Sequence, residues 1–103
     1  FREFLKEWYP KGDAGDGSNV IGYISAFMTV KVLQMCGDDL TRENLLHQAT
    51  SLTKVEAPLL LPGITITTTP QRYSPYTQMQ IARFDGSSWV PEGPVISIDG
   101  IGQ

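Results

Sequence analysis

The sequence predicts a protein of the mixed α/β class, with three helices followed by several short strands. Apolar residues recur at helical spacing through residues 1–52, whereas apolar and polar residues alternate in short segments of residues 64–98. The most apolar helix needs neighbours on every side, and the short strands offer little surface to cover it. The missing neighbours would be earlier strands of a larger parallel sheet, so the pattern indicates part of an α/β fold.

The first predicted helix is short and amphipathic. Its apolar residues recur at the spacing of one helix face: Phe1, Phe4, Leu5 and Trp8. It should end at Tyr9, because Pro10 disfavours the helical conformation in the residue before it. A loop rich in Gly and Asp follows over residues 11–17. The chain begins inside a helical pattern with no capping residue before it, which predicts a fragment of a longer protein.

The second predicted helix covers residues 19–36, with Ser18 as its N-cap and Gly37 as a left-handed stop. It is apolar around most of its circumference, and a stripe of small residues lies at helical spacing: Gly22, Ser25, Ala26 and Thr29. Such a helix is either buried or membrane-spanning. A span needs about 20 apolar residues, and Lys31 and Gln34 interrupt a segment that is shorter than this. We therefore expect a buried helix.

The third predicted helix begins after Thr41, which is its N-cap, and carries Glu43 in the first turn, where the helix dipole favours an anion. Its predicted buried face consists of four apolar residues: Leu45, Leu46, Ala49 and Leu52. The prolines at 58 and 62 then break the helical pattern.

Short strands are predicted in the last third of the chain. Apolar and polar residues alternate at 64–67 and again at 78–81. The segment 85–88, Asp-Gly-Ser-Ser, is typical of a hairpin turn and leads into Trp89-Val90. A final short strand is predicted at 95–98.

Composition narrows the classes of partner. The chain of 103 residues fits one domain at most, and it carries a net charge of −3. Nucleic acids and anionic membrane surfaces need clustered cations, and the sequence has no run of Lys or Arg, so neither is an expected partner. Cys36 is the single cysteine, which excludes an internal disulfide and any metal site built from several cysteines.

No catalytic constellation stands out, so we expect no enzyme, no catalytic residue, no metal site and no cofactor. His47 follows Glu43 by four residues, the spacing of a solvated pair on one helix face. Asp13, Asp16 and Asn19 lie among glycines, but their spacing lacks the alternating oxygen ligands of a calcium loop. A turn is the better interpretation of that segment.

Tyrosines are the best candidates for binding a small molecule, because each offers an apolar ring and one hydrogen-bonding group. Tyr73 and Tyr76 lie in a proline-containing loop, where anchoring of the loop is the expected role. Tyr23, near the start of the apolar helix, is the one predicted ligand-binding residue.

Five segments occur in an order that is typical of one family: residues 1–10 (Phe-x-x-Phe-Leu-x-x-Trp-Tyr-Pro), Gly22-Tyr23, residues 37–44 (Gly-Asp-Asp-Leu-Thr-Arg-Glu-Asn), residues 60–64 (Leu-Leu-Pro-Gly-Ile) and residues 83–90 (Arg-Phe-Asp-Gly-x-x-Trp-Val). Together they resemble the C-terminal segment of the periplasmic substrate-binding proteins of branched-chain amino-acid-type ABC transporters, the type I periplasmic binding proteins. The resemblance covers nearly the whole chain.

The resemblance implies a fold and a division of the chain. Members of this family have two α/β lobes joined by three crossing segments. On this basis the single fragment 1–103 is the C-terminal part of such a fold. Residues 1–66 would complete one lobe, residues 67–80 would form an inter-lobe crossover and part of the hinge, and residues 81–103 would form the terminal strands.

The resemblance also implies a function. These receptors bind an amino acid or a similar small molecule and deliver it to an ABC transporter membrane permease. The location would be periplasmic, with a signal peptide upstream of this fragment. Tyr23 matches a position near the ligand cleft, whereas the residues that hold the ligand's carboxylate and amino groups would lie upstream. We therefore expect weak binding or none by this chain alone.

Two alternatives remain open. A self-associating structural or interaction module would explain the apolar helix without any ligand, because a helix that lacks its sheet exposes a large apolar patch. A ligand-sensing domain of the same fold would signal rather than transport. Specificity would be set by residues upstream, so the resemblance implies no particular ligand.

Overall fold

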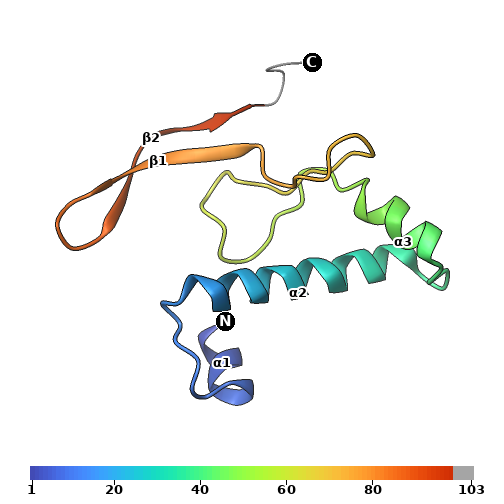
Figure 1. Ribbon diagram of the computed structural model, residues 1–103, viewed down its shortest axis with the longest axis horizontal. Coiled ribbons are helices and arrows are strands. Elements are labelled where there is room, and N and C mark those ends of the chain that lie inside the picture. The colour runs from blue at the N-terminus through green and yellow to red at the C-terminus, as the bar shows by residue number, and fades with distance from the viewer. Residues whose placement is uncertain (99–103) are drawn as a thin grey trace. The chain divides into compact units, whose positions relative to one another are not determined.

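The computed structural model describes residues 1–98, which form three helices and one β-hairpin (Figure 1). In chain order the elements are α1 (Arg2–Trp8), α2 (Gly17–Cys36), α3 (Arg42–Ala49), β1 (Gln78–Phe84) and β2 (Trp89–Ser97). The mixed class is thus confirmed. The described sheet is a two-stranded antiparallel pair, and no parallel sheet occurs within residues 1–98. The fold of a two-lobed receptor remains a prediction.

The chain divides into two compact units. The first, the helical unit, contains residues 1–48 and 57–59. The second, the hairpin unit, contains residues 49–56 and the described residues from 60 onward. The predicted division into lobe, crossover and terminal strands follows different boundaries and stays a prediction.

Helix α1 ends at Trp8, and its C-cap is Tyr9, the residue before Pro10. The Tyr9 amide donates to the Leu5 carbonyl at 2.8 Å and closes the last turn, and Tyr9 itself leaves the helical conformation. Leu5 is the buried residue of this helix, whereas Phe4 and Trp8 are exposed.

Helix α2 begins earlier than the sequence predicts. Asp16, not Ser18, is its N-cap, because the Asp16 carboxylate accepts from the Ser18 amide at 2.8 Å. The helix therefore has 20 residues. Its end agrees with the prediction, since Gly37 has a φ of +58°, a conformation that favours glycine.

The predicted burial of α2 is wrong for this chain. Ile24, Val32 and Cys36 are the buried residues of the helix. Several large apolar side chains are exposed: Ile21, Phe27, Val30, Leu33 and Met35.

The exclusion of a membrane span on grounds of length is also wrong, since α2 is long and apolar enough to cross a membrane. A core helix or a signal sequence would meet the same criteria.

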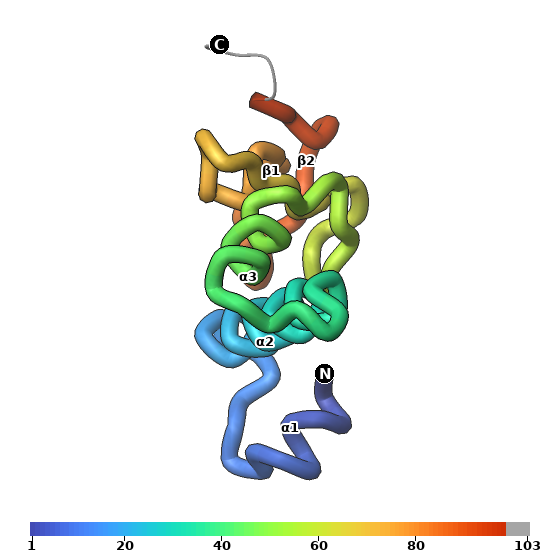
Figure 2. Tube along the Cα trace, turned by 90° about the vertical axis from the view of Figure 1, so that its right-hand side faces the viewer, coloured from blue at the N-terminus to red at the C-terminus, as the bar shows by residue number. Residues whose placement is uncertain are grey.

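Helix α3 lies beside the C-terminal end of α2 in both views (Figures 1 and 2). Thr41 caps it as predicted, and its hydroxyl accepts from the Asn44 amide at 3.3 Å. The Asn44 side chain donates to the Asp39 carbonyl at 2.8 Å and to the Cys36 carbonyl at 3.4 Å, which ties α3 to the end of α2. The predicted buried face is wrong in part, because Leu45 and Leu46 are exposed.

The predicted strand at 64–67 is wrong as a strand. Ile66 forms an isolated antiparallel bridge with Val55, with mutual amide-to-carbonyl distances of 2.8 Å. Beyond this bridge the two segments are joined by side-chain and backbone hydrogen bonds. The Lys54 amide donates to Thr67 Oγ1 at 2.9 Å, and the Thr68 amide donates to the Leu52 carbonyl at 2.9 Å. Among residues 49–56 and 60–98, Ile66 and Leu52 are the buried apolar residues.

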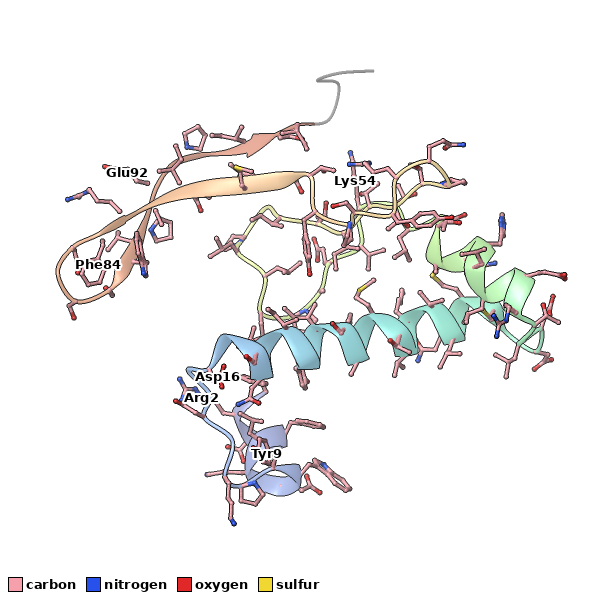
Figure 3. The ribbon with its side chains drawn as sticks, viewed as in Figure 1. Arg2, Tyr9, Asp16, Lys54, Phe84 and Glu92 are labelled. Atoms are coloured by element: carbon pink, nitrogen blue, oxygen red, sulfur yellow. The ribbon has the colours of Figure 1, made fainter. Side chains whose placement is uncertain are left out.

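The predicted hairpin is confirmed, although its second strand is longer than expected. β1 and β2 pair across the turn, and the rings of Phe84 and Trp89 lie 5.4 Å apart. Figure 3 shows Phe84 next to this turn. The segment predicted as a separate final strand at 95–98 mostly belongs to β2, which runs on from Trp89 to Ser97.

The Asp85 carboxylate stabilises the hairpin turn. The Asp85 carboxylate accepts from the amides of Ser88 and Ser87, both at 2.8 Å, and these bonds lower its pKa. Because its pKa is lower in the folded state, the ionised carboxylate stabilises the turn at pH values above the pKa that Asp85 has in the unfolded chain. This contribution is lost as the pH falls through the folded-state pKa.

We expect a carboxyl NMR titration of Asp85 to have its midpoint below that of Asp85 in the urea-unfolded chain. The amide shifts of Ser87 and Ser88 should follow the same midpoint. Asp85→Asn, which keeps an acceptor but cannot titrate in this range, should abolish the pH dependence of both amide shifts. An Asp85 midpoint equal to the unfolded value would contradict this account.

Candidate functional site

Tyr23, the predicted ligand-binding residue, lies in an aromatic cluster of the helical unit. Its ring centroid is 5.2 Å from that of Phe1 and 5.2 Å from that of Phe4, with interplanar angles of 61° and 67°. Both pairs are edge-to-face, an arrangement that aromatic rings favour because the positive edge of one meets the negative face of the other. Tyr23 is half-buried.

A pocket of about 260 Å³ opens at this cluster, between α1 and the first half of α2. Four aromatic residues line it: Phe1, Phe4, Tyr9 and Tyr23. Leu5, which is buried, contributes a further apolar wall. We call this the aromatic pocket.

Small residues of α2 give the aromatic pocket its open side. Gly22 and Ala26 both line it. A Cβ atom built at Gly22 would have no heavy atom within 4 Å, apart from its own chain neighbours and helix backbone. The small-residue stripe predicted for this helix thus leaves open space at Gly22.

The aromatic pocket contains no charged side chain among its lining residues. Apart from the two tyrosines, the lining residues with polar side chains are Ser18 and Asn19. One N–H of the Asn19 side-chain amide donates to the Asp13 carbonyl at 2.9 Å. The side chains that line the pocket are therefore suited to apolar rather than charged groups, whereas the α-amino group of Phe1 is charged when Phe1 is the first residue.

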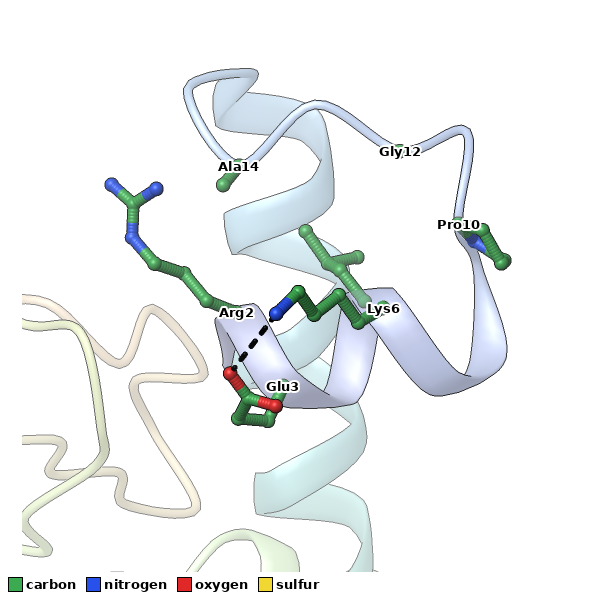
Figure 4. A pocket seen from close by; sticks show the side chains of 7 residues that line it. Arg2, Glu3, Lys6, Pro10, Gly12 and Ala14 are labelled. Atoms are coloured by element: carbon green, nitrogen blue, oxygen red, sulfur yellow. Dashed lines mark ion pairs between the residues drawn. The ribbon is translucent and has the colours of Figure 1, made fainter.

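A second pocket, of about 290 Å³, lies on another side of α1 and is lined by charged residues (Figure 4). Lys6 Nζ and Glu3 Oε1 are 3.8 Å apart, and Arg2 lines the same pocket. The Lys6 and Glu3 side chains are 79% and 88% exposed, so this pair is screened by water and adds little to stability. The mixed charges favour no single class of ligand.

The other residues that the sequence singled out have local roles. Asp13 Oδ1 accepts from the Gly15 amide at 2.8 Å, and Asp16 caps α2, which supports the interpretation of this segment as a turn. Within residues 1–98 no cluster of His, Cys, Asp or Glu could hold a metal ion. Tyr73 and Tyr76 are exposed residues of the hairpin unit.

The aromatic partners of Tyr23 were not predictable as site residues. The spacing of Phe1 and Phe4 predicts one face of α1, but not that this face meets Tyr23 of α2. Tyr9, labelled in Figure 3, was expected only as a helix end.

Comparisons with known proteins leave the family open. No family model matches the chain, and neither a search of curated proteins nor a search of solved structures returns a match. The resemblance to type I periplasmic binding proteins therefore remains a prediction.

Proposed function

We propose that this chain is part of an extracytoplasmic solute receptor, which binds an amino acid or a similar small molecule and delivers it to an ABC transporter permease. One observation carries the proposal. Tyr23, which the resemblance places near the ligand cleft, lines a pocket rich in aromatic side chains. Small-molecule sites in proteins are concave, mostly apolar and rich in aromatic residues.

The exposed surface of α2 supports the same proposal. Phe27, Val30 and Leu33 share one side of the helix at spacings of three residues and are 40%, 53% and 42% exposed. In a two-lobed receptor, strands from the rest of the lobe would cover this side, because helices pack on the faces of a parallel sheet. Lys31 would lie at the edge of that contact, where its long side chain reaches water.

The same exposed surface favours a second candidate, a self-associating interaction module. Two copies of α2 could cover each other without any sheet. Such a module would need no extracytoplasmic location and no small-molecule ligand, and these two properties separate the candidates.

Cell fractionation tests the receptor proposal. An antibody raised against this chain should detect its antigen in the soluble extracytoplasmic fraction. Antigen in the cytoplasm would contradict the proposal. Antigen that stays in the membrane after alkaline carbonate extraction would also contradict it, and would identify α2 as a membrane span.

A further inference from the structure

We infer that the aromatic pocket takes an uncharged aromatic ring of a small molecule, and not the charged head of an amino acid. The inference rests on the proposed function in one respect: the natural ligand would be the solute that the receptor binds. Which group the pocket accepts is argued from its walls, its size and its charge.

The walls favour a ring. Phe1 and Phe4 each present an edge-to-face contact to Tyr23, so the cluster is already arranged as aromatic rings prefer. Phe4 and Tyr9 remain 46% and 53% exposed, which leaves ring surface that a ligand can cover. A bound ring would add further contacts of the same kind to surfaces that water now covers.

The size fits one ring. An apolar cavity of roughly 150 Å³ can bind benzene, and the aromatic pocket has about 260 Å³. Sites for drug-sized ligands start at roughly 300 Å³, so a larger molecule would have to extend beyond the pocket. Gly22 provides the open side through which it would extend.

The side chains of the pocket favour a neutral group over an ionic one. No lining residue contributes a charged side chain, so a bound carboxylate would lose its hydration without gaining a charged side-chain partner. One N–H of the Asn19 side-chain amide donates to the Asp13 carbonyl. A neutral ring has no such cost and gains from leaving water.

Ligand-observed NMR on the full 103-residue chain tests the inference, with toluene as the uncharged probe and acetate as the charged one. The chain is acetylated at its N-terminus, so that the α-amino group of Phe1 adds no charge beside the pocket. We expect saturable binding of toluene and none of acetate. Gly22→Leu should weaken toluene binding at least about tenfold, because its side chain enters the open space at this lining residue of the pocket. Leucine also favours the helix over glycine, so α2 should remain folded.

Gly22→Ala is the matched control, since its single methyl group leaves most of the pocket free, and it should bind toluene almost as well as the original chain. Circular dichroism should show equal helix content in all three proteins. No saturable binding of toluene, or equal binding by Gly22→Leu and Gly22→Ala, would overturn the inference. A cytoplasmic location would overturn the receptor proposal instead and leave the toluene result intact.

Discussion

Replacing Thr68 by valine is expected to destabilise the hairpin unit by about 3 kcal/mol. Thr68 is buried, and its hydroxyl holds two backbone groups at once. It accepts from the Leu52 amide at 3.1 Å and donates to the Ala49 carbonyl at 2.6 Å. Valine keeps the shape of the side chain but leaves both backbone groups without this partner, and a buried polar group without a partner costs about 1–3 kcal/mol.

Thr67→Val is the matched control. The Thr67 hydroxyl accepts from the Lys54 amide at 2.9 Å in an exposed position, where water can replace it. We expect a loss of about 1 kcal/mol or less at this residue. Urea unfolding followed by NMR would measure both variants, with amide hydrogen exchange at Leu52 as the local probe. Equal losses for the two variants would contradict the role assigned to Thr68.

The second large effect concerns association of the isolated chain. We expect sedimentation velocity to detect dimers or larger species that grow with protein concentration, because the exposed face of Phe27, Val30 and Leu33 has no cover within its own unit. Val30→Glu should raise the dissociation constant more than about tenfold, since burying each valine is worth roughly 2 kcal/mol.

Ser25→Glu is the control for this experiment, because it adds the same charge to the same helix at an exposed residue away from that face. It should leave the association almost unchanged. A strictly monomeric original chain at high concentration would contradict the prediction. Equal loss of association in both variants would show that net charge, and not the apolar face, controls it.

Features fixed by short-range chemistry were predicted from the sequence. Gly37 ends α2 because its positive φ suits glycine, and Thr41 starts α3 because its hydroxyl reaches a free amide of the first turn. The turn after Asp85 follows in the same way from one carboxylate and two nearby amides. The error at the start of α2 has a local cause, since Asp16 and Ser18 are both good caps and the carboxylate caps the Ser18 amide.

Features that depend on distant parts of the chain were not predicted. The alternation at 64–67 looks like a strand, but Ile66 forms an isolated backbone bridge there. Thr67 binds the facing segment through its hydroxyl group, and Thr68 binds it through its hydroxyl group and its backbone amide. The aromatic pocket depends on α1 meeting α2 at Tyr23, and periodicity reports the face of a helix, not its neighbour. For the same reason the apolar pattern of α2 indicated burial without indicating what would cover it.

Calorimetric titration with amino acids tests the central claim most directly. Two samples are compared. One is the polypeptide that contains this sequence, purified from the cells that make it, and the other is the 103-residue chain alone. The receptor account predicts micromolar binding of at least one amino acid or aromatic acid by the isolated polypeptide, and weak binding or none by the chain. It would be contradicted if the isolated polypeptide bound none of them, or if the chain alone bound one with equal affinity.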